Sequence, residues 1–208
     1  MISITPNSSA NTPQDAKYHA VERLLQTLQS GKVYRREDFA MVSKAVDRHL
    51  QQLVSQGALK RIAQGLYHAP QKSVFGDVPP DDHELVTAFL KDSDFLIFSP
   101  SHYNSLGLGL TQLYNKTVVY NHKRHGTFVF GHRQFDFRVK HRFPQTLSPE
   151  FLLVDVINNL HELAEDQHSL IERTRQKLTS FDTVKLTDAV SKYGSIATQK
   201  RFRAWLNA

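Results

Sequence analysis

Residues 31–70 read GKVYRREDFAMVSKAVDRHLQQLVSQGALKRIAQGLYHAP, and this stretch decides the fold. It predicts a short helix over Arg36–Ala40 and, after a capping Ser43, a longer helix that Gly57 ends. Two short strands are expected on either side of Gln64-Gly65, where the glycine can supply the positive φ of a tight turn. The stretch therefore predicts two helices followed by a β-hairpin.

One more helix is expected ahead of this stretch. Thr12 can cap it, and its apolar face recurs at helical spacing in Val21, Leu24, Leu25 and Leu28. Residues 1–14 are expected to form a disordered leader. Helix, short helix, helix and hairpin in this order are typical of a helix-turn-helix domain with a β-wing, which we place at residues 15–72.

Polar side chains lie opposite the apolar stripe of the helix that follows Ser43. Such residue types can reach phosphates or base edges of duplex DNA, although a solvated helix face would have the same pattern. We expect base-edge contacts from Ser43, Lys44, Arg48 and Gln51, phosphate contacts from Arg35 and Arg36, and contacts of the wing from Lys60, Arg61 and Gln64.

A second domain is expected over residues 83–208, after a linker at 73–82 that contains Gly76, Pro79 and Pro80. Strands are predicted at 117–120 and 127–130, and apolar and polar residues alternate in a third strand around Phe135 and Phe137. We expect these strands to form an antiparallel meander, followed by several helices. The predicted fold class is α+β, an N-terminal winged helix-turn-helix followed by a C-terminal domain with an antiparallel sheet and helices.

The chain has 208 residues and a net charge of +6, and part of the basic excess falls on this sheet. Residues 116–142 hold seven Lys or Arg and one Asp. As a functional surface they would form an electropositive face for DNA, RNA or an acidic protein; otherwise they solubilise one side of the sheet. Both interpretations stay open for Lys116, Lys123, Arg124, Arg133, Arg138, Lys140 and Arg142.

Composition and motifs exclude several classes of protein. The chain has no cysteine, which excludes disulfides and thiol catalysis, and it has no phosphate-binding glycine loop. His122, His125 and His132 could bind zinc, but they flank turns beside Lys and Arg and more simply add to a basic surface. We expect no enzyme activity, metal or cofactor, no secretory signal and no membrane span.

Several short motifs recur in one known family. They are Asp38-Phe39, Gly57-Ala58-Leu59-Lys60-Arg61, Gly65-Leu66-Tyr67 with Pro70, and further on Asn104-Ser105-Leu106-Gly107-Leu108 with Gln112. Together they resemble the AbiEi-like antitoxins of type IV toxin–antitoxin systems, over roughly residues 17–165.

The resemblance implies a bacterial cytoplasmic repressor. Such proteins bind inverted repeats of double-stranded DNA in their own promoter and counteract a separately encoded nucleotidyltransferase toxin, generally without a stable complex; their C-terminal domain is associated with antitoxin activity. The leading hypothesis is thus a sequence-specific DNA-binding transcriptional regulator of this kind. The alternatives are an interaction or RNA-binding module that acts through the basic sheet, and a metal-dependent nuclease that uses the three histidines.

Overall fold

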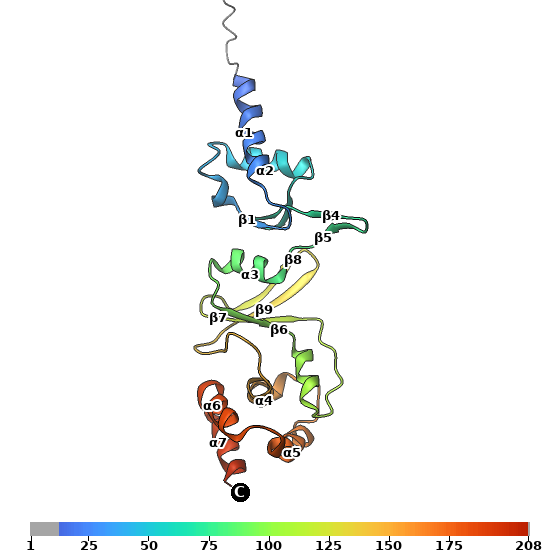
Figure 1. Ribbon diagram of the computed structural model, residues 1–208, viewed down its shortest axis with the longest axis vertical. Helices are drawn as coiled ribbons and strands as arrows, with labels where there is room; N and C mark the ends of the chain where they lie inside the picture. Colours follow the sequence, from blue (N-terminus) through green and yellow to red (C-terminus); the bar gives the residue numbers. More distant parts are fainter. Residues whose placement is uncertain (1–12, 208) are drawn as a thin grey trace, which may run out of the picture. The chain divides into compact units, whose positions relative to one another are not determined.

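The computed structural model describes residues 13–207 (Figure 1). It is a mixed α and β protein with several helices, and its backbone contacts divide it into two compact units, Met1–Lys91 and Asp92–Ala208. Residues 1–12, which include the expected cap Thr12 and most of the expected leader, lie outside the described residues. Pro13 already begins the first helix.

The first unit builds its helices and strands in the predicted order. The predicted short helix and the hairpin are confirmed, whereas the three-residue strand β1 is too short for its own sequence pattern to reveal. The elements are α1 (Pro13–Thr27), β1 (Val33–Arg35), the 3₁₀ helix η1 (Arg36–Phe39), α2 (Val46–Ser55), β2 (Lys60–Ala63) and β3 (Leu66–His68). The three strands form an antiparallel sheet in the order β1-β3-β2.

Apolar side chains from α1, η1 and α2 meet in one core in this unit. Helix α2 contributes Val46, Leu50 and Leu53, and α1 contributes Val21 and Leu24. These residues recur at three- and four-residue spacing, so one stripe of each helix turns inward. The opposite side of α2 is thereby left exposed to solvent.

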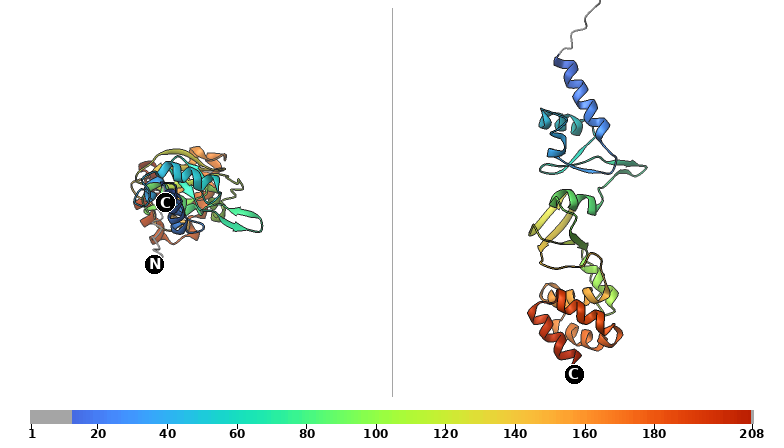
Figure 2. Two further views of the ribbon diagram at one scale, coloured as in Figure 1. Left: turned by 90° about the horizontal axis from the view of Figure 1, so that it is seen from above. Right: turned by 60° about the vertical axis from the view of Figure 1, so that its left-hand side comes forward.

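The predicted linker is structured. Two strands, β4 (Gln71–Ser73) and β5 (Gly76–Val78), form a hairpin that projects from the first unit (Figure 2), and helix α3 (Asp82–Leu90) follows within the same unit. The boundary between the units thus falls after Lys91 rather than at residues 73–82. Gly76, which favoured a linker in the sequence, begins β5 directly after the turn, with φ 106°.

The second unit has a four-stranded sheet and a set of helices. Its elements are β6 (Phe95–Phe98), η2 (Pro100–Leu106), β7 (Thr117–Asn121), β8 (Gly126–Phe130), β9 (Arg133–Val139), α4 (Pro149–Asn158), η3 (Leu160–Glu162), α5 (Gln167–Lys177), η4 (Leu178–Ser180), α6 (Thr183–Tyr193) and α7 (Ile196–Leu206). The sheet order is β6-β7-β9-β8.

The expected antiparallel meander is wrong, because β7 and β9 pair in parallel and β8 lies at the edge. Asn121 ends β7 and redirects the chain: its Oδ1 accepts hydrogen bonds from the backbone N–H groups of Lys123 and Arg124, at 2.8 and 2.7 Å. Strand β9 lies inside the sheet, and its Phe135 and Phe137 are fully buried. Strand β8 lies at the edge and leaves Val129 60% exposed.

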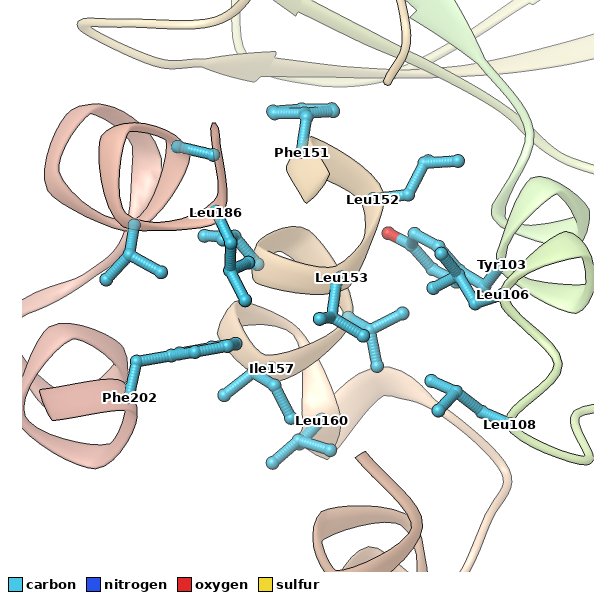
Figure 3. Packing of buried hydrophobic residues seen from close by; sticks show 14 of the residues in the cluster. Tyr103, Leu106, Leu108, Phe151, Leu152, Leu153, Ile157, Leu160, Leu186 and Phe202 are labelled. Carbon is cyan, nitrogen blue, oxygen red and sulfur yellow. The ribbon is translucent and has the colours of Figure 1, made fainter. Parts of the chain in front are cut away.

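Helix α4 forms the centre of the second core. Every residue from Phe151 to Ile157 is buried, as expected for a helix that is covered on all sides. Figure 3 shows α4 between Leu186 and Phe202 on one side and Tyr103 and Leu106 on the other. Within residues 13–207, none of the helices has the length and apolar character that crossing a membrane requires.

Candidate nucleic-acid interface

The exposed side of α2 carries polar and cationic side chains. Arg48, Gln51 and Ser55 lie on it, and Lys44 precedes the helix, also exposed. The described residues provide no ion pair for Lys44 or Arg48. Both cations are therefore available to an external anion.

A groove of about 740 Å³ runs between α2 and the β2–β3 hairpin. It is lined by Arg36, Asp47, Gln51, Val54, Ser55, Arg61, Gln64, Gly65 and Tyr67. The hairpin turn is held against η1 because the Arg36 N–H donates to the Gly65 carbonyl at 2.9 Å. The fold thus brings together four of the residues expected at the interface, namely Arg36, Gln51, Arg61 and Gln64.

Arg36 already has a carboxylate partner in this groove. Its Nε and Nη2 donate to Oδ1 and Oδ2 of Asp47 at 2.6 and 2.7 Å. This hydrogen bonding lowers the pKa of Asp47 below its usual value. Asp47 was not among the predicted site residues, although it stands one residue before Arg48. Carboxylates at a base-reading helix can accept a hydrogen bond from the N4 amino group of cytosine.

Arg35 does not face the groove as a free phosphate ligand. Its Nη1 donates to the carbonyl oxygens of Ala88 and Phe89 at 2.6 and 3.3 Å, and its Nε lies 2.8 Å from Glu37 Oε1. Cations are favoured at the C-terminal carbonyls of a helix, here those of α3. The structure thus corrects the expectation for Arg35: it holds α3 in the first unit.

Ser43 is a second correction. It is 4% exposed, and its hydroxyl lies 2.8 Å from Nδ1 of the buried His49 and accepts from the Ala45 N–H at 3.1 Å. The N-cap of α2 is Ala45 rather than Ser43. A side chain that is turned inward in this way cannot reach a base edge.

His49 predicts a pH-dependent stability of the first unit. Burial, with a contribution from the Arg48 charge, lowers the pKa of His49 below 6.5, and residues 13–207 offer its Nε2 no hydrogen-bond partner. The unfolded state therefore binds the proton more tightly, so this stability is complete above pH 6.5 and is lost as the pH falls towards the folded-state pKa. Hydrogen-exchange protection factors of the α2 amides should fall between pH 7.5 and 5.5.

The matched variant is His49→Asn, which keeps a polar group for Ser43 and does not titrate in this range. Its α2 protection should change less over the same interval. An equal loss of protection in both proteins would assign the pH effect to other groups.

The hairpin cations differ from one another. Lys60 pairs with Asp77 of β5 at 2.6 Å, and Lys72 pairs with the same carboxylate at 2.5 Å. Arg61 and Gln64 are exposed, and the part of the chain that the structure describes offers Arg61 no ion-pair partner. Arg61 is therefore the stronger candidate for a backbone contact.

Most of the basic block of residues 116–142 is paired with acids or aromatic rings. Lys123 bonds to Asp92 at 2.8 Å, Lys116 lies 3.7 Å from Glu162, and Arg138 bonds to both Asp136 and Glu162. Lys140 lies over the Tyr120 ring and Arg133 over the Phe135 ring. Arg124 and Arg142 are exposed. Asp92 and Glu162 come from outside the block, so counting the charged residues of 116–142 alone overstates the positive charge of this surface.

The three histidines do not assemble a metal site. Nε2 of His122 lies 3.2 Å from Asp94 Oδ2, and its ring stacks on Phe143. Within residues 13–207, no three His, Cys, Asp or Glu side chains are grouped so that they could hold a metal ion.

The Leu-Gly-Leu motif serves the core of the second unit. Leu106 and Leu108 are buried, and Asn104 Nδ2 donates to the Gln112 carbonyl at 3.1 Å. Gly107 caps η2 with φ 66°, a backbone conformation that favours glycine. The structure thus gives these residues a packing role.

A buried polar cluster that the sequence did not reveal lies behind this motif. Asp155 is 2% exposed and accepts hydrogen bonds from the hydroxyls of Tyr103 and Tyr120, at 2.6 and 2.8 Å. Burial raises the pKa of Asp155, and the two tyrosine hydrogen bonds partly offset that rise. Burial and the nearby carboxylate likewise raise the pKa values of both tyrosines.

Comparisons with known proteins add a family and a fold. A search of curated proteins gave no match. The crystal structure of the RV2827C protein from Mycobacterium tuberculosis is similar, with 14% identity and a TM-score of 0.55 over 91% of this chain and 75% of that chain. At this identity the likeness concerns the fold alone. Residues 20–182 match the model of a family described as "Family of unknown function (DUF6088)". Since that match spans most of the chain, the protein belongs to the DUF6088 family.

Proposed function

We propose that the protein is a sequence-specific DNA-binding transcriptional regulator whose first unit works as a winged helix-turn-helix. The observation that carries the proposal is the groove between α2 and the β2–β3 hairpin, where polar side chains of both elements meet. The element order and the β1-β3-β2 sheet order support the same proposal. In this arrangement α2 enters the major groove and the hairpin follows the backbone.

Each side chain then has a distinct task. Lys44, Arg48 and Gln51 face base edges, where Arg and Lys recognise guanine and Gln recognises adenine. Arg61 and Gln64 contact the backbone and set the register. Arg36 keeps Nη1 for a phosphate while Asp47 holds its other nitrogens.

Base reading is tested with Arg48→Ala and Gln51→Ala. Each should weaken binding by about 1–3 kcal/mol and relax the sequence preference at one base pair. The measurement is fluorescence anisotropy with a duplex from the DNA upstream of the chain's own reading frame. Arg175→Ala removes the same charge from an exposed site on α5 and should leave affinity nearly unchanged. If Arg175→Ala weakens binding as much as Arg48→Ala does, the α2 assignment is wrong.

Backbone contact is tested with Arg61→Ala. This variant should weaken binding to all sequences alike and reduce the slope of log K against log salt by about one unit, because one fewer counterion is released. Lys60→Ala should change the slope less, since Asp77 already pairs with Lys60. Titrations at several salt concentrations distinguish the two, and an unchanged slope for Arg61→Ala would remove the hairpin from the interface.

The AbiEi resemblance extends the proposal to an antitoxin. The protein would repress its own operon at inverted repeats and oppose a nucleotidyltransferase toxin in the cytoplasm without a stable complex. Co-expression with a nucleotidyltransferase from the neighbouring reading frame tests this role. Arg48→Ala should then lose repression while still rescuing the cells, and a failure of the wild type to rescue them would restrict the proposal to DNA binding.

A further inference from the structure

The tip of the β4–β5 hairpin exposes two adjacent apolar side chains. Val74 is 94% exposed and Phe75 is 98% exposed. Figures 1 and 2 show the hairpin extending away from the helices of the first unit. An aromatic ring in this position contributes nothing to the packing of the unit, so a folding role does not account for it.

The tip is held in a fixed conformation. The Ser73 hydroxyl donates to the Gly76 carbonyl at 2.8 Å and accepts from the Phe75 N–H at 3.2 Å. Ser73 and Gly76 are also strand partners, and Gly76 has φ 106°. The exposed ring is thus presented on an ordered turn.

The base of the hairpin is tied to the sheet and is cationic. Asp77 of β5 pairs with Lys72 of β4 and with Lys60 of β2, and hydrogen bonds from Lys60 and then Lys72 lower its pKa. An isolated two-stranded hairpin is marginally stable in water, so these ion pairs support the projection. Two ammonium groups against one carboxylate leave a net positive charge at the base of the hairpin that carries the apolar tip.

We propose that this hairpin is a second DNA-contacting arm, with Phe75 acting as a wedge in the minor groove beside the site that α2 reads. Minor-groove proteins combine cations with an apolar side chain that enters a base step and kinks the duplex. One Phe and one Val can bury far less surface area than the roughly 800 Å² per partner of a stable protein interface. The continuity through Lys60 with the β2–β3 hairpin also favours DNA, so the inference rests on the proposed function.

The test uses the full chain and a 30-base-pair duplex from the DNA upstream of its own reading frame, labelled at both ends. We expect wild-type protein to raise energy transfer between the ends, because a wedge bends DNA by about 20–90°. Phe75→Ala should abolish this rise and weaken binding about tenfold. Phe75→Leu, which keeps an apolar wedge, should retain most of both effects.

Ile196→Ala is the matched control, since Ile196 is 89% exposed at the start of α7 in the second unit. It should leave bending and affinity unchanged. If Phe75→Ala keeps wild-type bending and affinity while Arg48→Ala loses affinity, the wedge is wrong and the proposed function stands. If the wild type does not bind the duplex, both are wrong. A wild-type dimer that Phe75→Ala dissociates without DNA, measured by light scattering, would assign the tip to a second copy and overturn the inference.

Discussion

Replacing Arg138 by alanine is expected to destabilise the second unit by about 2–4 kcal/mol. The Arg138 side chain is 13% exposed, and its guanidinium donates to Asp136 Oδ2 at 2.7 Å and to Glu162 Oε1 at 2.8 Å. Burial lowers the pKa of Arg138, but its hydrogen bonds with Glu162 and Asp136 outweigh burial and raise it above the usual value. Without the guanidinium, the two carboxylates would face each other, with Lys116 Nζ 3.8 Å from Asp136 and 3.7 Å from Glu162.

The free energy of unfolding can be followed in urea through Trp205, the only tryptophan of the chain. It lies on α7 against Phe202, with ring centroids 5.1 Å apart, so it reports on the second unit. Arg142→Ala, an exposed arginine of the same basic block, should change stability by less than about 0.5 kcal/mol. Equal effects of the two variants would contradict a structural role for Arg138.

This prediction also changes how the basic block can be tested. Reversing the charge of Arg138 would disrupt the fold, so a loss of activity would not report on surface contacts. Arg142 is exposed, and its reversal leaves the Arg138 ion pairs intact. Toxin rescue that survives Arg142→Glu would argue against this part of the sheet as an interaction surface.

Local patterns were enough to predict part of the first unit. The helical spacing of Val46, Leu50 and Leu53 and the glycine at 65 each act within a few residues, so η1, α2 and the β2–β3 hairpin follow from neighbouring side chains. Strand β1 and the sheet order of the second unit depend on pairing with distant segments, and a short sequence pattern carries little information on such pairing.

The same limit applies to the candidate site. The sequence identifies residue types on the exposed side of α2, and the structure places Arg48 and Gln51 there. The sequence does not reveal that Arg35 donates a hydrogen bond to a carbonyl 53 residues away, or that Lys60 forms an ion pair with Asp77. Charge counting treats every cation as free, whereas folding pairs many of them with acids from other elements.

Replacing Asp155 by alanine is expected to have the largest effect on stability, about 2–6 kcal/mol. The Tyr103 and Tyr120 hydroxyls both donate to this carboxylate, and removing it would leave them buried without that acceptor. Each unsatisfied buried hydroxyl costs about 1–3 kcal/mol. Urea unfolding followed by Trp205 fluorescence measures the loss in the second unit.

Removing all three polar groups together distinguishes an unmet hydrogen bond from lost packing. In the variant with Asp155→Leu, Tyr103→Phe and Tyr120→Phe, no hydroxyl needs a partner. Asn159 Nδ2 loses the Tyr120 hydroxyl as an acceptor but keeps its hydrogen bond to the carbonyl of residue 155. Because an apolar replacement of a buried polar cluster is often neutral, most of the stability should return. If the triple variant is as unstable as Asp155→Ala, packing around α4 rather than the tyrosine hydrogen bonds accounts for the loss. If the triple variant recovers, the cluster is not required for stability. The role of its hydrogen bonds is then to fix one arrangement of η2, β7 and α4, the three elements that supply its members.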